Sequence, residues 1–339
     1  MIVIFISSLA ANATPDEIET LEQAYAIRDA LKELGYASVI VPFTLDLAKM
    51  RQVIKEYNPK LAFNLVETID DRSNLIHWVP SWLEYLGIPC TGGGGKSLFM
   101  TTDKLMTKNF FRLVGIPTPP AIADPLKLLR ADFPKDGPYF VKSVIEEGSF
   151  GLGQDCLVHD YDNLMKIFEG RVKKYGGRWF AERYIGGREF NISVLAGPNG
   201  PEVLPIVELQ FIDLSPGQIP IVDYAAKWIP ESELYQKTQR SFDFPPEDES
   251  LLIKLRELAL TCWKEFDALG YIRVDVRVDA DGEPWVLEVN VNPSLAPGLK
   301  PGEEAGFVAA ARKAGLDYID IVDRIIKDVE LNPPIKSIT

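Results

Sequence analysis

Short apolar runs and amphipathic stretches alternate along the first 95 residues. Residues 2–6 are all β-branched or aromatic, which predicts a buried strand. In the helix that follows, Thr14 is the expected N-cap, Pro15 the first helical residue and Glu17 the second member of a capping box. Gly35 is placed to end this helix in a left-handed conformation.

Two more apolar runs, 38–43 and 61–66, predict strands on either side of a helix at about 46–57. The order strand, helix, strand, helix, strand is typical of a parallel sheet with helical crossovers. We therefore expect an α/β domain here. The segment Gly87–Gly95, which contains the glycine run Gly92–Gly95, is predicted to be a glycine-rich turn at a domain junction.

After this junction the pattern changes. A helix is predicted at about 102–114, and Gly115 ends it. Short strands separated by glycine-rich turns are predicted at 138–144, 155–159, 178–184, 188–196 and 202–207. Residues 213–246 are polar and irregular, and a connection of that length is usually functional. Helices are predicted at about 248–268 and 317–328.

The strongest local signal is a polar stripe on a predicted β-hairpin. Residues 271–278 and 285–292 both alternate polar and apolar side chains, and Asp281-Gly282 between them favours a two-residue turn. This turn places Asp275 opposite Glu288 and Arg273 opposite Asn290. Opposed carboxylates ~5 Å apart repel by about 3 kcal/mol at an effective dielectric constant of ~20.

A cation between Asp275 and Glu288 would remove this repulsion. Oxygen ligands without histidine or cysteine favour a hard cation, and two carboxylates with the amide of Asn290 suit Mg²⁺ that carries substrate phosphates. The alternative is a solvated hairpin face on which Arg273 and Arg277 neutralise the acids.

Lysines and glycines indicate a phosphate site. Lys142 ends a predicted strand, and the glycine-rich segment 146–153 follows it, so backbone N–H groups could close over phosphate oxygens. Lys104 is a second candidate. An ordinary turn and a solvated helix lysine are the alternatives. Gly92–Ser97 resembles a P-loop, but Cys90 stands where that motif needs glycine, so a Walker-type NTPase is disfavoured.

Composition narrows the function classes. The 339 residues suffice for two or three domains at ~150 residues each. The 36 basic and 49 acidic residues give a net charge of −13, which disfavours nucleic acid as a partner. Three dispersed cysteines indicate reduced thiols. Because no apolar run approaches the ~18 residues of a membrane span, we expect a cytoplasmic protein without membrane contact.

In sequence order, these segments resemble the ATP-grasp enzymes, specifically the D-alanine–D-alanine ligases. The matching stretches are Gly87-Ile-Pro-Cys-Thr-Gly92, Asp103-Lys-Leu-Met-Thr-Lys108, Gly115-Ile-Pro-Thr-Pro119, Val141-Lys142, Glu147-Gly-Ser149, Ala181-Glu-Arg-Tyr-Ile-Gly-Gly-Arg-Glu189, Asp223-Tyr-Ala-Ala-Lys227, Arg273-Val-Asp275 and Leu287-Glu-Val-Asn290. The resemblance implies an ATP-grasp fold of three α/β domains, with ATP between the second and third. These would be an N-terminal domain 1–95, a central subdomain 96–185, and a C-terminal subdomain 186–330 with a lid loop at 213–240.

The resemblance also implies site residues. ATP would be held by Lys104, Lys142, Gly148, Ser149, Glu182, Arg183, Tyr184, Ile185, Glu189 and Lys227. Of these, 182–185 would line the adenine pocket and Glu189 would hold the ribose. Asp275, Glu288 and Asn290 would bind two Mg²⁺ ions, for which Mn²⁺ could substitute. Arg273 would stabilise the developing oxyanion, and Ser149 and Tyr224 are further catalytic candidates.

The implied activity is an ATP-dependent carboxylate–amine ligase. Transfer of the γ-phosphoryl group makes an acyl phosphate, and an amine then displaces phosphate to form a peptide or amide bond. The substrates would be ATP and small amino acids or a peptide, and the family tends towards homodimers. Two other readings are a nucleotide-binding module without ligase activity and an unrelated phosphotransferase.

The sequence departs from the family where it recognises amino acids. The family's Ser-x-Glu segment is replaced around Thr14–Glu17, where only Asp16 or Glu17 could loosely substitute. The family's His-Gly stretch is absent. Phe150 occupies the position of a serine in the family. Ser294 occupies the position of a glycine whose N–H helps to hold the oxyanion. These differences favour the same reaction on a different or broader substrate. Both a D-alanine–D-alanine ligase and a relative that joins other amino acids or a peptide stay open.

Overall fold

The computed structural model describes residues 1–8, 15–145, 149–229, 231–298 and 302–333. Thr14 and Gly148 lie outside these ranges. Among the described residues, no helix is long and apolar enough to cross a membrane. Short 3₁₀ helices cover Ser73–Leu75, Pro125–Lys127, Arg130–Asp132, Gln154–Cys156 and Pro246–Asp248.

The N-terminal sheet is parallel, as predicted, with strand order β2-β1-β3. Its strands are β1 (Ile2–Ile6), β2 (Ser38–Pro42) and β3 (Leu61–Leu65), joined by α1 (Pro15–Glu33) and α2 (Leu47–Tyr57). Strand β1 is buried on both faces, because Ile2, Ile4 and Ile6 belong to the core that includes α1. Val3 and Phe5 belong to a second core that includes Met50 of α2.

The glycine run was expected to be a turn, and here the prediction was incomplete. Helix α3 (Trp78–Leu86) precedes the run, and α4 (Gly95–Thr102) begins at its last glycine. Asp103 then ends α4 and caps α5 (Lys104–Val114), because its side chain accepts hydrogen bonds from the N–H groups of Leu105 and Met106. The predicted helix at 102–114 therefore starts at Lys104.

The central sheet is antiparallel, with strand order β4-β7-β5-β6. It contains β4 (Ala121–Ile122), β5 (Tyr139–Ser143), β6 (Leu157–Val158) and β7 (Trp179–Arg183). Helix α6 (Tyr161–Tyr175) packs on this sheet and was not predicted. Its apolar Leu164, Ile167 and Phe168 recur at helical spacing, a signal that the sequence does contain.

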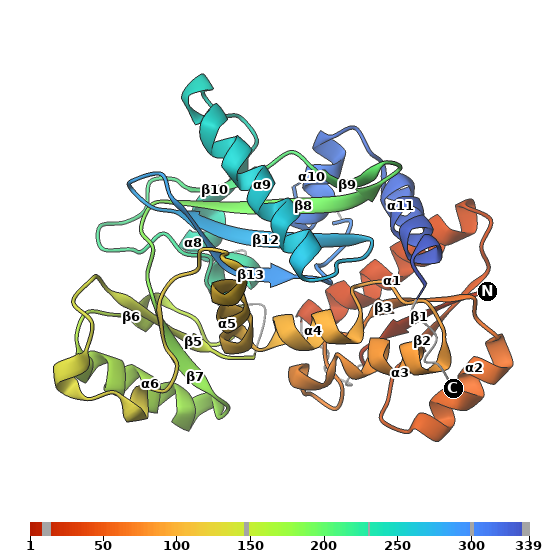
Figure 1. Ribbon diagram of the computed structural model, residues 1–339, viewed down its shortest axis with the longest axis horizontal. Coiled ribbons are helices and arrows are strands. Elements are labelled where there is room, and N and C mark those ends of the chain that lie inside the picture. Colours follow the sequence, from red (N-terminus) through yellow and green to blue (C-terminus); the bar gives the residue numbers. More distant parts are fainter. Residues whose placement is uncertain (9–14, 146–148, 230, 299–301, 334–339) are drawn as a thin grey trace.

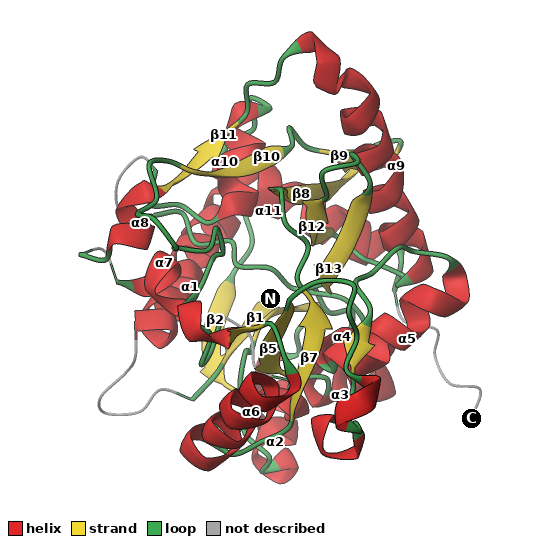
Figure 2. Ribbon diagram, turned by 90° about the vertical axis from the view of Figure 1, so that its left-hand side faces the viewer, coloured by secondary structure: helices red, strands yellow, loops and turns green. Residues whose placement is uncertain are grey.

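The C-terminal sheet is also antiparallel, with the order β11-β10-β8-β12-β13 and with β9 paired to β8. Its strands are β8 (Arg188–Gly197), β9 (Gly200–Val203), β10 (Val207–Phe211), β11 (Thr238–Ser241), β12 (Tyr271–Val278) and β13 (Pro284–Asn290). The strand predicted at 202–207 was wrong, because it joins the end of β9 to the start of β10. In Figure 2 the strands β8, β12 and β13 lie above the central strands β5 and β7.

One face of the C-terminal sheet is covered by α9 (Glu249–Glu265), which lies across β8 and β12 in Figure 1. Leu252, Leu255 and Ala259 of α9 share a core with the apolar side chains of both strands. The segment 213–246 is not irregular throughout, because it contains α7 (Tyr224–Trp228), α8 (Glu233–Lys237) and β11. The short length of these elements explains why periodicity did not reveal them.

Two helices complete the chain, α10 (Gly306–Lys313) and α11 (Tyr318–Leu331). Helix α11 was predicted, and Asp317 and Asp320 form a capping box at its start. The core beneath these helices continues into the side of the N-terminal sheet that α1 covers. The division of the chain at residues 95 and 185 stays a prediction.

Candidate active site

Polar side chains line the face of the C-terminal sheet that α9 does not cover. Asp275 of β12 pairs with Glu288 on one side and with Asn191 of β8 on the other. Two residues earlier on β12, and on the same face of the sheet, Arg273 pairs with Asn290 of β13 and with Ser193 of β8. The predicted opposition of the two acids is therefore confirmed. Asn191 and Ser193 were missed, although polar residues alternate with apolar ones along 189–194.

The predicted two-residue turn was wrong. The N–H of Asp279 donates to the carbonyl of Glu283 over 3.1 Å, which leaves a three-residue loop that ends at Gly282 with φ +79°. The ladder consequently pairs Val276 with Val286, one residue out of the expected register. A bulge between Val276 and Asp275 corrects this shift, so that Glu288 still faces Asp275.

Asp275 is buried, with 8% of its surface exposed. Its carboxylate accepts hydrogen bonds from Arg273 at 2.8 and 2.9 Å and from the Asn191 amide at 2.7 Å. Burial and the negative charge of Glu288 nevertheless raise the pKa of Asp275, although Arg273 lowers it. The alternative of a solvated face is wrong, but its expectation that Arg273 neutralises an acid is confirmed.

Glu288 has the opposite electrostatic environment. Burial would raise its pKa, but Lys104, Lys227, Lys142 and Arg273 together lower it to about 2. The lysines come from the start of α5, from β5 and from α7. Positive charge from separate parts of the chain therefore converges beside the acids. Such a cluster can bind an anionic substrate despite the acidic balance of the whole chain.

Glu182 of β7 is a buried acid between two lysines. Lys108 pairs with its carboxylate at 2.6 Å, and Lys142 pairs with it as well. The Lys108 ammonium also donates to Thr118 at 2.8 Å and to the carbonyl of Pro119 at 3.1 Å. Lys108 was not predicted as a site residue, although it follows Lys104 by one helical turn. An adenine contact for Glu182 stays a prediction.

The other predicted nucleotide residues lie between the central and C-terminal sheets. Arg183 ends β7, and Tyr184 and Ile185 begin the connection to β8. Glu189 is buried on β8 and pairs with Arg277 at 3.2 Å, so Arg277 does not neutralise Asp275 or Glu288 by a direct bond. Burial raises the pKa of Glu189, and Arg277 lowers it.

The glycine-rich loop contacts the predicted lid. Ser149 has a φ of +63° and donates a hydrogen bond to the carbonyl of Val222 over 2.7 Å. Asp223 caps the short helix on which Tyr224 and Lys227 lie. The Tyr224 side chain is exposed, and its catalytic role stays a prediction.

An acid that was not predicted lies next to Ser294. Ser294 donates to the carboxylate of Glu19 on α1 over 3.1 Å, beyond the end of β13. The side chains of Asp16 and Glu17 lie outside the described part of the structure. Glu19 lies within a helical turn of both residues, and whether one of these acids replaces the family's acid stays a prediction.

The donor set at the acids fits a metal that a nucleotide brings with it. Within the described residues, no group of three or more His, Cys, Asp or Glu side chains could hold a metal ion. The predicted set instead combines Asp275 and Glu288 with the amide of Asn290, whose oxygen accepts the N–H of Asn292 at 3.0 Å. All of these donors are oxygens, which suits Mg²⁺ completed by water and phosphate.

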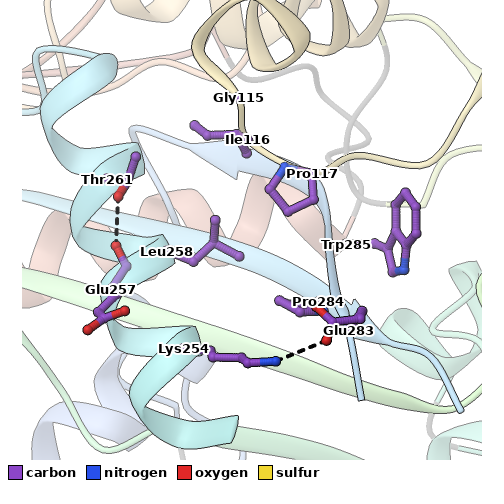
Figure 3. Close-up of a pocket in the computed structure, with 10 residues that line it drawn as sticks. All are labelled: Gly115, Ile116, Pro117, Lys254, Glu257, Leu258, Thr261, Glu283, Pro284 and Trp285. Atoms are coloured by element: carbon purple, nitrogen blue, oxygen red, sulfur yellow. Dashed lines mark hydrogen bonds and ion pairs between the residues drawn. The ribbon is translucent and has the colours of Figure 1, made fainter. Parts of the chain in front are cut away.

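A separate surface recess lies beside α9. It has a volume of about 480 Å³ and is lined by the segment that follows α5, by α9 and by the start of β13 (Figure 3). Lys254 and Glu283 form an ion pair at 3.0 Å within it. None of the predicted site residues in the described ranges lines this recess. It is therefore distinct from the polar face of the sheet.

Comparison with known proteins decides the family. Residues 134–327, more than half of the chain, match the model of the D-alanine–D-alanine ligase C-terminus. A D-alanine–D-alanine ligase of Synechococcus sp. (strain JA-3-3Ab) is 31% identical over 254 residues, which cover 74% of this chain and 71% of that protein. This chain belongs to the D-alanine–D-alanine ligase family.

Other members of the family extend the match over the whole chain. The D-alanine–D-alanine ligase of Moorella thermoacetica is 27% identical over 339 residues, covering 97% of this chain and 99% of that protein. The structure of the D-alanine–D-alanine ligase from Bacillus anthracis complexed with ATP has a TM-score of 0.71 at 23% identity, with 97% of both chains covered. The predicted ATP-grasp fold is therefore confirmed, and the chain is an ATP-dependent, ADP-forming C–N ligase.

Proposed function

We propose that this ligase uses ATP to join the carboxylate of an α-amino acid to the amine of a second amino acid or a peptide. The observation that carries the proposal is the convergence of Lys104, Lys142 and Lys227 beside Glu288, which faces Asp275. Lysines and acids at one place suit a phosphoryl group and the cation that accompanies it. The curated relatives named above as D-alanine–D-alanine ligases make D-alanine the first candidate substrate.

The first step forms an acyl phosphate. A carboxylate oxygen of the first amino acid attacks the γ-phosphorus of ATP, and the bond to ADP breaks. Lys104, Lys142 and Lys227 bind the phosphoryl oxygens on which negative charge develops. Asp275, Glu288 and Asn290 would hold magnesium, which would supply further positive charge to the same oxygens.

The second step forms the amide bond. The neutral amine attacks the acyl carbon, and the carbonyl oxygen becomes an oxyanion. The carbonyl then re-forms as the bond to phosphate breaks, and the phosphate leaves with the proton that the amine nitrogen loses. Arg273 lies next to Asp275 on the same face of β12 and can donate a hydrogen bond to this oxyanion. Because the same guanidinium pairs with Asp275, a cation bound to Asp275 would release Arg273 for this role. Removing an oxyanion donor typically costs ~10²–10³ in rate.

The acyl phosphate must be protected from water. Residues 213–223 precede α7 and contact the glycine-rich loop through the bond between Ser149 and Val222. We assign to this segment and α7 the role of the predicted lid, because residues 219–222 are hydrogen-bonded both to Gln154, between β5 and β6, and to Arg277 of the C-terminal sheet. A closed lid favours transfer to the amine over hydrolysis.

The amino-acid pocket differs from the family pattern, and Glu19 is our candidate for its ammonium-binding acid. Arg240 of β11 lies within electrostatic reach of Glu19 and Arg273. An acid and arginines at one end of the site suit the ammonium and carboxylate groups of amino acids. Glu19 would bind the ammonium group that all amino acids share, so it supports recognition of amino acids as a class.

ADP release in the presence of ATP and Mg²⁺ tests this proposal. D- and L-amino acids are supplied singly and in pairs, and products are identified by mass spectrometry. D-Alanine alone should stimulate ADP release if it is both substrates, whereas a response only to other acids would assign a different substrate. The absence of stimulation by any amino acid or dipeptide would contradict the proposal.

We also propose that the enzyme acts in the cytoplasm as a homodimer. Its substrate ATP is available there, and free Cys90, Cys156 and Cys262 suit a reducing compartment. Light scattering of the purified protein would measure its mass, and a value near the monomer's 37.9 kDa would contradict the dimer.

A further inference from the structure

Arg277 is a buried cation for which the reaction described above has no use. Only 3% of its surface is exposed, and it lies on β12 directly opposite Glu189 of β8. Its Nη1 atom is 3.2 Å from Oε2 of Glu189. Burying both charges is costly unless each is well paired, so this pair must be supported by further contacts.

Those further contacts come from two other segments. The Nη1 atom also donates to the carbonyl of Pro220 at 2.8 Å, and Nη2 donates to the carbonyl of Gly187 at 3.1 Å. The guanidinium carbon lies 4.9 Å from the centre of the Tyr184 ring. One side chain therefore connects Glu189, the connection between β7 and β8, and the segment that contains Pro220.

Residues 219–222, which we call the strap, are also attached to the central part of the chain, mainly to the connection between β5 and β6. The Gln154 side chain accepts from the N–H of Ile219 at 2.7 Å and donates to its carbonyl at 3.2 Å. Ser149 binds the carbonyl of Val222. Ile219 and Ile221 pack in a small cluster with Phe140 and Tyr184. Arg277 is thus the polar attachment of the strap to the C-terminal sheet.

The hydrogen-bonding capacity of Arg277 is not filled. Its Nε atom is buried and has no hydrogen-bond partner among the residues that the structure describes. Unpaired donors are rare in buried arginines, because the N–H group loses its water without compensation. The unfilled donor lies in the neighbourhood of Glu189 and Tyr184, where the nucleotide is expected.

We infer that Arg277 is a positioning residue of the nucleotide site, which holds the Glu189 carboxylate towards the ribose and fastens the strap over the bound nucleotide. This inference rests on the proposed function, because the ribose contact of Glu189 belongs to that proposal. It deepens the proposal, because ribose recognition by Glu189 and attachment of the strap would both depend on Arg277. Loss of Arg277 must then weaken both together.

Calorimetric binding of ATP, 2′-deoxy-ATP and 3′-deoxy-ATP tests the first half of the inference. The wild type should bind ATP about tenfold more tightly than the analogue that lacks the hydroxyl bound by Glu189. Glu189→Gln and Arg277→Met should each bind ATP about tenfold or more weakly and lose this discrimination. Arg277→Lys keeps the charge and should restore part of it.

Hydrogen exchange of the strap tests the second half. The amide of Ile219 should exchange faster in Arg277→Met than in the wild type, with ATP present. Arg324→Met is the matched control, because Arg324 is a partly buried arginine that pairs with Glu202 outside the site. It should change neither the discrimination nor the exchange of the strap.

Each outcome decides a separate question. Failure of the wild type to bind ATP would contradict the proposed function itself. A wild type that discriminates between the nucleotides, with Arg277→Met discriminating equally well, would overturn only the inference about Arg277. If Arg277→Met does not fold, the same comparison is made with Arg277→Lys, and unchanged discrimination together with unchanged strap exchange would overturn the inference.

Discussion

Asp275 and Glu288 face each other on β12 and β13, yet their surroundings shift their pKa values in opposite directions. Burial and the neighbouring glutamate disfavour the charge of Asp275. The lysines and Arg273 favour the charge of Glu288. The two acids are therefore not equivalent, and neutral substitutions should affect protein stability differently.

Asp275→Asn should inactivate the enzyme without unfolding it. An amide keeps the shape of the side chain, and the raised pKa of Asp275 means that its surroundings tolerate a neutral group. We expect ADP release to fall on the order of 10²–10³-fold, while the free energy of unfolding in urea changes by less than ~1 kcal/mol. Steady-state kinetics and urea titration measure the two effects.

Asp267→Asn is the control for this substitution. Asp267 lies in an exposed pair with Lys96, at 2.8 Å, and should tolerate the change in both measurements. Retention of wild-type activity by Asp275→Asn would contradict the assignment of this carboxylate to the site.

Glu288→Gln should destabilise the protein in a pH-dependent way. The pKa of Glu288 is lowered from 4.5 to about 2, so its charge stabilises the folded state above pH 4.5, and this contribution is lost as the pH falls towards 2. At 1.36 kcal/mol per pH unit the contribution is at most about 3 kcal/mol. The stability difference between wild type and variant should therefore be largest above pH 5 and shrink by pH 3. Urea titrations at several pH values measure it, and a difference that is independent of pH would contradict the prediction.

Lys108→Met should weaken ATP binding through Lys142. Glu182 now shares its charge between Lys108 and Lys142, and without Lys108 it would hold Lys142 more firmly. We expect the KM for ATP to rise about tenfold, and the protein to lose ~1–3 kcal/mol of stability because a buried pair is broken.

Two variants separate these effects. Lys108→Arg keeps the charge and should recover part of the ATP affinity. Lys254→Met removes a lysine from an exposed pair with Glu283 and should change neither quantity. A destabilised Lys108→Met protein with the wild-type KM would show that Lys108 has only a structural role.

The sequence predicted local patterns well and long-range partners poorly. The alternation of residues along β12 and β13 was enough to place Asp275 opposite Glu288, because a strand's period of two fixes the face of each side chain. The error at the turn did not propagate, since the bulge after Asp275 compensated for it. No pattern in the sequence could show that Glu182 pairs with Lys108, or that Arg277 pairs with Glu189, because those pairs depend on how distant strands and helices meet.

The amino-acid end of the site illustrates the same limit. The family resemblance located an acid near residues 14–17, and the structure instead brings Glu19 to Ser294. One helical turn separates these positions, so the sequence could indicate the right helix but not the right residue. The docking of α1 against the segment after β13 decides which side chain faces the site.

Gly92→Ala should impair activity through Asn292. A Cβ atom on Gly92 would lie 2.3 Å from Oδ1 of Asn292, which also accepts a hydrogen bond from Tyr271. The N–H of Asn292 in turn donates to Asn290, a predicted metal ligand. We therefore expect a displaced Asn290 and at least a tenfold fall in ADP release, with a stability loss above the ~1–2 kcal/mol typical of a left-handed alanine.

Gly35→Ala isolates the contact with Asn292 from backbone strain. Gly35 and Gly92 both have a φ of +81°, but a Cβ atom on Gly35 would meet none of the described residues beyond its chain neighbours within 4 Å. Both variants carry the same backbone strain, so the difference between them reports the collision with Asn292. Gly35→Ala should keep wild-type kinetics and lose only the stability that the strain costs. Equal effects of the two substitutions on ADP release would show that the glycine run does not support Asn290, and that its left-handed residues serve only the turn into α4.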